Sequence, residues 1–414
     1  MPSMRSVAQR VLRISALGLL AAVVLTAGCA TRRPPLTASE PGPSVTERRG
    51  EELPVPPPKP PILTAPKKAE PPKKLEAMAL EAPLAKYPIV RVYFATDRAR
   101  TADYLPKSPY GSGRSIMGYG FSDVSIPPVH RPGELERPSL WRFELAENPE
   151  RHIVVRSFNP ESRPEFFRSV AGAVGRSPEK SALVFVHGYN VEFLEAVRRT
   201  AQITYDLGFD GASILFSWPS RGRPADYTID EASAEAAVPD LREFLTALAS
   251  ETGARVIHVV AHSMGNRALL RALADVESDP RVPQVFRNVV LAAPDIDRDV
   301  FTRDLLPRFK GRPSHLTLYA SDTDEALKAS KKFHGYPRAG EAGRDIVVAP
   351  DLDTIDATGM DPSLLGHSYF ASLEPVVDDI AKLLRGDLAP AQRGLREQVL
   401  GALKYWIVLP QPNP

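Results

Sequence analysis

The chain has 414 residues, with 52 Lys or Arg against 50 Asp or Glu, so its formal net charge at pH 7 is +2. This balance, without a basic stripe that carries interleaved aromatics, excludes nucleic acid from the expected partners. Apolar residues make up 43% of the chain, enough for a full core, whereas the 42 prolines are concentrated and indicate a region without helix or sheet.

The first 28 residues have the pattern of an export signal. Three arginines lie between positions 5 and 13, and residues 14–27 are apolar but too short to span a membrane. The segment ends in Leu25-Thr26-Ala27-Gly28-Cys29, which resembles a bacterial lipoprotein signal, where the cysteine is lipidated and becomes the mature N-terminus. Because Cys29 is the only cysteine, it can form no internal disulfide. We predict a signal peptide over residues 1–28 and a lipid anchor at Cys29, with a plain secretory signal as the alternative.

Residues 29–86 are predicted to be a Pro-rich, disordered tether. Runs such as those at 54–61 and 71–74 cannot enter helix or sheet interiors and favour polyproline II. At about 3.1 Å per residue, such a tether reaches on the order of 100 Å from its anchor. The predicted localisation is the bacterial envelope. Ala30, directly after the cysteine, is compatible by analogy with the outer membrane and a periplasm-facing domain.

From residue 87 to 414 the pattern predicts a single α/β domain. Short β-rich runs come first, and near-continuous apolar strands then alternate with amphipathic helical stretches. Such alternation predicts a mostly parallel central sheet with helices on both faces, and ligands then bind at the carboxyl ends of the strands. The expected strands cover residues 89–95, 120–126, 152–157, 182–186, 212–216, 256–260, 289–292, 316–320 and 353–358.

A loop after an early strand is the first part of a candidate site. The strand over 183–186 ends in His187-Gly188-Tyr189-Asn190. In serine hydrolases of this chain order, one oxyanion donor is the backbone N–H that follows the nucleophile, and the other comes from such a loop. These donors are expected to be the amides of Met264 and Tyr189. Asn190 is also a candidate N-cap for the next helix, a role compatible with the first.

Ser263 is the predicted nucleophile. The apolar run that begins at residue 256 ends in this serine, and a helical pattern follows at once. Strand, sharp turn and helix form the context of a nucleophile elbow, in which the turn lifts the serine Oγ above the sheet edge. The turn requires small residues two positions either side, here Ala261 and Gly265. An ordinary strand-to-helix turn with a capping serine is the alternative.

A serine hydroxyl needs a base and an orienting carboxylate, which in this fold follow it in the chain. Three histidines follow Ser263, and His315 precedes a strand instead of ending one. His367 follows the final strand and precedes a helix, which is the expected position of the base. His334 is the alternate.

Three aspartates are candidates for the triad acid. Asp322 and Asp324 follow the strand over 316–320, and Asp295 follows the preceding strand. Spacing alone leaves the three open, because Asp324 and Asp295 also precede helical stretches that they could cap. The alternation of aspartates at 295, 297 and 299 lacks a matching Glu or His, so neither a metal nor any other cofactor is expected.

Six short blocks carry a resemblance to a known family. They are VYFATDR at 92–98, VHGYN at 186–190, FSWPS at 216–220, AHSMGN at 261–266, APDID at 293–297 and GHSYF at 366–370. With these blocks in order, residues 90–406 are similar to a bacterial α/β-hydrolase family of largely uncharacterised function, described as esterase/lipase-superfamily enzymes. The resemblance implies the α/β-hydrolase fold and places the acid at the aspartate of Tyr-x-Ser-x-x-Asp-x-Ala-Leu, here Asp324. It leaves the substrate open.

The sequence therefore predicts an envelope-anchored serine hydrolase that cleaves a carboxylic ester or related acyl bond through Ser263, His367 and Asp324. The expected partners are a small-molecule or lipid ester and the membrane that holds the anchor; protein partners stay open. The alternative from another class is a non-catalytic, tethered binding or scaffolding module on a hydrolase fold. A metallohydrolase lacks ligands, since His258 and His262 are four apart on a strand and turn, not on one helical face.

Overall fold

The computed structural model describes residues 87–105, 107–138, 144, 146–360 and 374–409. The predicted signal peptide, Cys29, the tether up to residue 86 and the predicted base His367 lie outside these residues.

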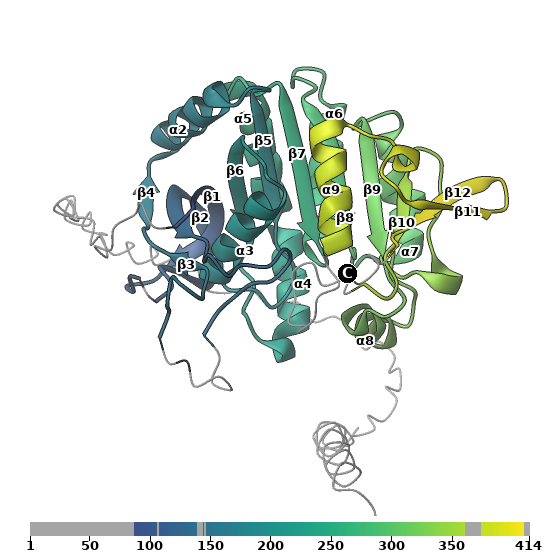
Figure 1. Cartoon of the computed structure of the whole chain (residues 1–414), viewed down its shortest axis with the longest axis horizontal. Helices are drawn as coiled ribbons and strands as arrows, with labels where there is room; N and C mark the ends of the chain where they lie inside the picture. Colours follow the sequence, from purple (N-terminus) through teal and green to yellow (C-terminus); the bar gives the residue numbers. More distant parts are fainter. Residues whose placement is uncertain (1–86, 106, 139–143, 145, 361–373, 410–414) are drawn as a thin grey trace, which may run out of the picture. The chain divides into compact units, whose positions relative to one another are not determined.

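A 12-stranded sheet organises the described residues, with its strands in the order β11-β12-β10-β9-β8-β7-β5-β6-β1-β2-β3, and β4 also pairs with β2 (Figure 1). All neighbouring pairs from β1 across to β12 are parallel. Antiparallel pairs occur at the two edges, where β1 meets β2, β2 meets β3 and β4, and β11 meets β12. The predicted mostly parallel sheet is confirmed. The strands are β1 (Ile89–Arg100), β2 (Tyr110–Ser125), β3 (Val154–Val155), β4 (Asn159–Glu161), β5 (Ser181–Val186), β6 (Ala212–Ser217), β7 (Val256–His262), β8 (Phe286–Ala292), β9 (His315–Ala320), β10 (Asp353–Asp356), β11 (Arg396–Leu400) and β12 (Leu403–Ile407).

The continuous apolar strands of the sequence are explained by burial on both faces of the sheet. In β5, Leu183 and Phe185 pack into one core, while Val184 and Val186 pack into the other. Side chains of successive residues alternate between faces, so a strand covered on both sides must be apolar at every position.

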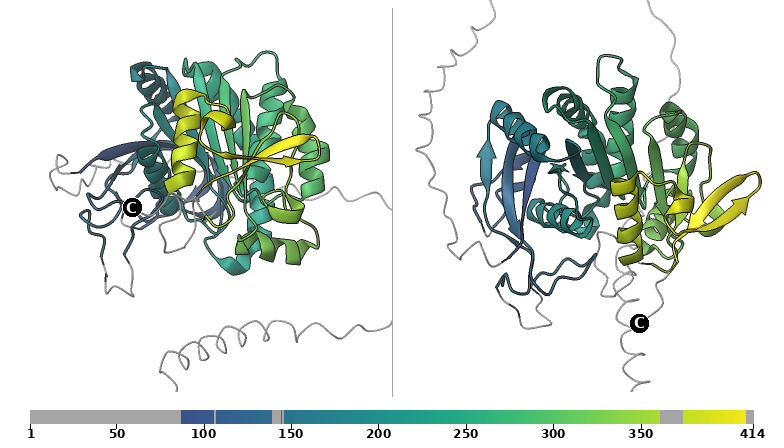
Figure 2. Two further views of the ribbon diagram at one scale, coloured as in Figure 1. Left: turned by 45° about the vertical axis from the view of Figure 1, so that its right-hand side comes forward. Right: turned by 45° about the horizontal axis from the view of Figure 1, so that its top comes forward.

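Helices cover both faces, as predicted. The helices α2, α5 and α6 pack on one face, and α3 and α9 on the other (Figures 1 and 2). The α-helices are α2 (Arg163–Arg176), α3 (Phe193–Asp206), α4 (Tyr227–Ala236), α5 (Val238–Glu251), α6 (Gly265–Ser278), α7 (Arg298–Val300), α8 (Glu325–His334) and α9 (Glu374–Gly386). The shorter turns are the 3-10 helices η3 (Pro224–Asp226), η5 (Leu306–Phe309), η6 (Gly343–Asp345) and η7 (Pro390–Gln392) and the π-helix η4 (Phe301–Leu305).

The two edges of the sheet differ in how their strands pair. The expected strand over 152–157 is reduced to β3, because β2 pairs with β3 through only two residue pairs and with β4 further along. At the other edge, β12 pairs with β10 and extends the sheet sideways.

Within the described ranges, no helix combines the length and the apolar character that a membrane crossing requires.

Candidate active site

Ser263 lies in a strained turn between β7 and α6. Its φ of +48° is in the left-handed region, which a residue with a side chain occupies only when the surrounding structure holds it there. The backbone of β8 and the following loop provide that hold. The Ser263 N–H donates to the Ala292 carbonyl at 2.9 Å, and the Ser263 carbonyl accepts from the Asp295 N–H at 3.2 Å. A strained serine between strand and helix is the geometry of a nucleophile elbow.

The two small residues around the serine differ in whether a side chain fits at their position. A Cβ added at Gly265 would lie 2.3 Å from the His187 carbonyl oxygen, so the helix start can approach the neighbouring loop only with glycine there. Ala261 is fully buried within β7, where its methyl group belongs to the core. The A-x-S-x-G pattern therefore keeps glycine at the position where two backbones meet.

The loop after β5 lies directly against the serine. A Cβ added at Gly188 would lie 3.1 Å from the Ser263 Cβ and 2.7 Å from the His262 Nδ1. Within the described residues, the N–H groups of Tyr189 and Met264 donate to no protein acceptor, as is required of groups that receive a ligand oxygen. Asn190 is not a helix N-cap as the turn chemistry suggested. It takes a φ of +61°, and α3 begins only at Phe193.

A buried arginine holds this loop from behind. Arg98, from β1, is 2% exposed, and its guanidinium bonds the carbonyls of Val191 and Ser220, each at 2.8 Å, and the Ser217 Oγ at 2.8 Å. Its remaining partners are the Gly111 carbonyl and the His187 ring. All of these partners are neutral. Burial lowers the pKa of Arg98 to about 10, which leaves it charged at neutral pH.

His187 links Arg98 to the peptide bond between Gly188 and Tyr189, whose N–H is a predicted oxyanion donor. Its Nδ1 lies 2.8 Å from the Gly188 carbonyl oxygen, which can only accept, so Nδ1 carries the proton. The Nε2 then accepts from Arg98 at 3.3 Å. Burial and the Arg98 charge hold the pKa of His187 well below its usual range, consistent with a neutral ring. Trp218 stacks on this ring, with centroids 4.9 Å apart, and its Nε1 donates to the His187 carbonyl at 2.7 Å. We call Arg98, His187, Gly188, Tyr189 and Trp218 the oxyanion wall.

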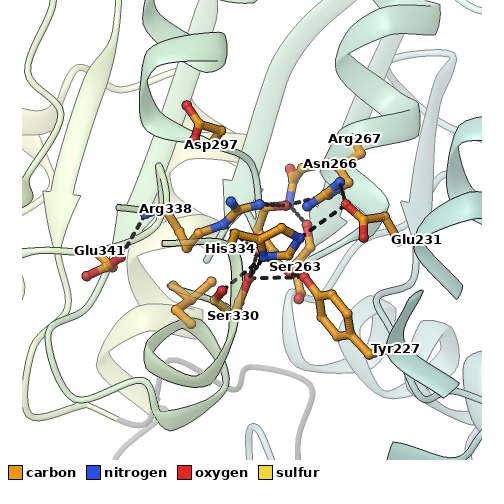
Figure 3. A network of polar contacts seen from close by, with 12 residues as sticks. Tyr227, Glu231, Ser263, Asn266, Arg267, Asp297, Ser330, His334, Arg338 and Glu341 are labelled. Carbon is orange, nitrogen blue, oxygen red and sulfur yellow. Dashed lines mark hydrogen bonds and ion pairs between the residues drawn. The ribbon is translucent and has the colours of Figure 1, made fainter. Parts of the chain in front are cut away.

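Near Ser263 lies a network of charged and hydroxyl side chains, which includes Arg338, Ser330, Tyr227, Arg267 and Glu231 (Figure 3). Arg338 Nε donates to the Asp295 carboxylate at 2.8 Å, and both side chains are almost fully buried. The hydroxyls of Ser330 and Tyr227 donate to the same carboxylate. Arg267 bonds the Asp295 carbonyl and pairs with Glu231. We call Asp295, Arg338, Ser330, Arg267 and Glu231 the charged wall.

The three candidate acids have different surroundings. The Asp295 carboxylate already accepts hydrogen bonds from Tyr227, Ser330 and Arg338. Asp322 is exposed, and its backbone N–H donates to the Thr358 hydroxyl. Asp324 directly precedes α8, and its Oδ1 caps that helix by accepting from the Leu327 N–H at 3.0 Å. It lies after β9, at the carboxyl edge of the sheet.

The alternate base His334 belongs to the last turn of α8. Its Nδ1 lies 2.9 Å from the Ser330 carbonyl, and its Nε2 lies 3.4 Å from Glu231. These contacts tie the ring to the charged wall. His367, between β10 and α9 in the chain, lies outside the described residues.

The run of aspartates after β8 forms no cluster of potential metal ligands. Asp297 caps α7 through Oδ1, which accepts from the backbone N–H groups of Asp299 and Val300. Over the part of the chain that the structure describes, no three His, Cys, Asp or Glu side chains lie together as a metal site would need.

Sequence reasoning missed the second layer of the site, by which we mean the residues that hold the loop after β5 and Asp295 in place. Arg98 lies inside one of the six blocks, but three of its partners, Val191, Ser217 and Ser220, are more than ninety positions away in the chain. Arg338 and Tyr227 had no local signal, since each meets Asp295 only through the fold. Trp218 is fully buried against His187.

The strand order, the covering helices and the strained serine at the carboxyl edge define an α/β hydrolase. The chain belongs to the family described as "Alpha/beta hydrolase of unknown function (DUF900)", whose model matches residues 164–386. A comparison with curated proteins found no match.

Two solved structures share weak similarity with the chain. A "predicted CIB-like hydrolase" from Thermoplasma acidophilum is 13% identical over 51% of this chain and 88% of its own, with a TM-score of 0.31. A "Lipase-esterase related protein" from Clostridium acetobutylicum is 16% identical over 39% of this chain and 61% of its own, with a TM-score of 0.20. At these scores they add nothing to the assignment, which depends on the family match.

Proposed function

We propose that the protein is a serine hydrolase of the bacterial envelope that cleaves a carboxylic ester or related acyl bond. The observation that carries this proposal is the strained Ser263, packed against a loop whose Tyr189 N–H, like that of Met264, donates to no described protein group. A hydrolase that forms a tetrahedral intermediate needs this combination of a raised nucleophile and free, fixed N–H donors.

The proposed reaction follows the serine triad scheme. The Ser263 Oγ attacks the acyl carbonyl as His367 takes its proton, and the carbonyl oxygen gains negative charge between the N–H groups of Met264 and Tyr189. The intermediate collapses to an acyl-enzyme when His367 returns the proton to the leaving oxygen. Water, deprotonated by the same histidine, then attacks the acyl group and regenerates Ser263.

Asp324 is the proposed acid that orients His367. Its position after β9 supports this role, as does the commitment of Asp295 to Arg338, Ser330 and Tyr227, which makes Asp295 a brace for the elbow. Asp324→Asn is therefore expected to lower kcat about ten-thousandfold with the fold retained. Asp322→Asn serves as the matched control two residues away and should keep nearly all activity. The reverse ranking would reassign the acid.

The primary test is covalent labelling of the full-length protein with a fluorophosphonate. The wild type should be labelled, and Ser263→Ala should lose both the label and the hydrolysis of p-nitrophenyl butyrate, by several orders of magnitude. Ser278→Ala, an exposed serine at the end of the same helix α6, should react as the wild type does. An unreactive wild type would leave the tethered binding module as the better reading.

The envelope location rests on the predicted lipid anchor, which is part of this proposal. The lipoprotein-like segment before Cys29 and the absence of a second cysteine support it. Cells grown with radiolabelled fatty acid should incorporate label into the wild type and not into Cys29→Ser. Equal incorporation in both would contradict the anchor while leaving the hydrolase proposal intact.

A further inference from the structure

Two aromatic side chains are exposed at the C-terminal end of α8. Phe333, in the last turn of α8, is 65% exposed, and Tyr336, just after this helix, is 66% exposed. Burying a phenylalanine ring is favourable, so a ring left in water here offers apolar surface that a ligand can cover.

Phe333 is the outer end of a series of ring contacts that leads to the oxyanion wall. Its ring contacts the Tyr227 ring, with centroids 5.9 Å apart. The Tyr227 ring in turn contacts the Tyr189 ring at 5.2 Å. Tyr189 is the residue whose N–H is a proposed oxyanion donor. We call Tyr189, Tyr227 and Phe333 the aromatic ladder.

The hydroxyl groups of the ladder are already used elsewhere. The Tyr227 hydroxyl donates to Asp295, and the Tyr189 hydroxyl donates to the Pro224 carbonyl. Burial, followed by the Asp295 charge, raises the pKa of Tyr227 above its ordinary value, so this phenol stays neutral. With both polar ends bound to protein groups, the ladder offers its rings, and not its hydroxyls, to a ligand.

The ladder is also fixed in position relative to Ser263. Ser330 and Phe333 lie one turn apart on α8, and the Ser330 hydroxyl donates to Asp295 at 2.6 Å. The Asp295 N–H donates to the Ser263 carbonyl. One residue thus joins the nucleophile turn to α8, and Figure 3 shows Tyr227, Ser330 and His334 gathered beside Ser263.

We propose that the aromatic ladder is the subsite for the acyl chain of the substrate, which makes the preferred substrates esters of apolar acyl chains longer than acetyl. This inference rests on the proposed serine hydrolase function. An acyl carbonyl held at the Tyr189 N–H has the Tyr189 ring adjacent, and a chain that extends along Tyr227 to Phe333 removes exposed apolar surface from water.

Alkyl fluorophosphonates test the subsite without a known substrate. The Ser263 Oγ gives its proton to the proposed base His367 and forms a bond to phosphorus as fluoride leaves. The alkyl group on phosphorus then occupies the place of the acyl chain. For the full-length protein, the decyl probe should react at least tenfold faster than the methyl probe. Phe333→Ala should lower this decyl-to-methyl ratio about five- to tenfold while the methyl rate stays within about twofold. Phe333→Leu should keep most of the preference, since it restores apolar area.

Val399→Ala is the matched control, because Val399 is 63% exposed and lies on the edge strand β11. It should leave both rates unchanged. Equal decyl and methyl rates in the wild type would overturn the subsite and leave the hydrolase function standing, whereas no labelling by either probe would overturn the function itself.

Two further outcomes would also overturn the subsite. An equal fall in both rates in Phe333→Ala would mean a structural role for the ring. A Phe333→Ala effect that appears only with substrate in anionic phospholipid vesicles, with the probe ratio intact, would make this surface a membrane contact instead.

Discussion

The two walls that flank Ser263 are stabilised in opposite ways. The oxyanion wall surrounds one buried cation, Arg98, with neutral partners. The charged wall pairs each cation with a carboxylate, as Arg338 does with Asp295 and Arg267 with Glu231. The cation of the oxyanion wall is thus stabilised by hydrogen bonds to neutral groups, and the cations of the charged wall are stabilised by carboxylate charges. Loss of one partner should therefore leave an unpaired charge in the charged wall and a displaced loop in the oxyanion wall.

The largest effect is expected from the buried pair of the charged wall. Asp295→Asn removes the anion from Arg338 and should lower the free energy of unfolding by about 3 kcal/mol, because an unpaired buried charge is costly. Urea unfolding followed by far-UV circular dichroism measures this change. The double variant Asp295→Asn/Arg338→Met should recover part of the loss. A loss below about 1 kcal/mol would mean that the Asp295 charge is not what stabilises Arg338, and the contrast between the two walls would fail.

A third buried ion network lies outside both walls. It provides a test of whether a buried ion pair makes the free energy of unfolding depend on pH. His130 lies between Glu136 and Asp206, at 2.8 and 2.6 Å, and hydrogen bonds to these carboxylates, together with their charges, outweigh burial and raise its pKa to about 9. A raised pKa stabilises the fold fully below about pH 6.5, and this contribution is lost as pH rises through about 9.

The expected contribution of His130 is up to about 3 kcal/mol. Wild-type stability from urea unfolding should therefore fall between about pH 6.5 and 9, and His130→Gln should be destabilised far more at pH 6 than at pH 10. An equal difference at both values would show that the imidazole charge plays no part.

For the oxyanion wall, Gly188→Ala should act on catalysis more than on folding. The new methyl group would press on His262 and Ser263 and displace the loop, so kcat should fall about a hundredfold, the usual cost of one oxyanion donor. Affinity for a trifluoromethyl ketone, whose adduct carries the oxyanion, should fall in parallel. Gly175→Ala in α2, where a Cβ meets nothing within 4 Å, is the control and should leave kcat unchanged.

Arg98→Met should produce a smaller loss of the same kind. Without the guanidinium, His187 and the Val191 carbonyl lose their common donor, and kcat should fall about ten- to hundredfold with KM nearly unchanged. The pH–rate profile should keep its shape, since His187 is already neutral. A raised KM with normal kcat would place Arg98 in substrate binding instead of in positioning.

The sequence was informative where structure is determined locally. The β7–Ser263–α6 unit and the loop at His187 were predicted because strand periodicity, small residues and turn chemistry all lie within a few positions. Asn190 shows the limit of such reasoning, since it has a φ of +61° and α3 begins only at Phe193. The backbone N–H groups of Asn190 and Val191 donate to Asp230 and Ser220, which are distant in the chain.

The second layer could not be predicted because its partners are distant in the chain. Arg98 and Ser217 are 119 positions apart, and Asp295 and Arg338 are 43 apart. Hydrophobic periodicity contains no information about pairs so distant in the chain. From the sequence alone, an arginine near the end of a strand cannot be told from a solvent-exposed one. The triad acid is likewise open from spacing alone, and the family resemblance is what places it at Asp324. The contacts of the Asp295 carboxylate with Tyr227, Ser330 and Arg338 carry no local sequence signal either.

The position of β1 has a consequence for the order in which the chain folds. β1 is the first strand of the domain to be synthesised, yet its parallel neighbour is β6, and the Thr96 hydroxyl bonds the Ser217 carbonyl 121 positions later. The β1–β2 pair and the contact of Arg98 with the Gly111 carbonyl are local and can form early, whereas the Val191, Ser217 and Ser220 acceptors come much later in the chain. The oxyanion wall is therefore completed only after the chain has been synthesised past Ser220, and until then the Arg98 guanidinium lacks most of the partners that allow its burial.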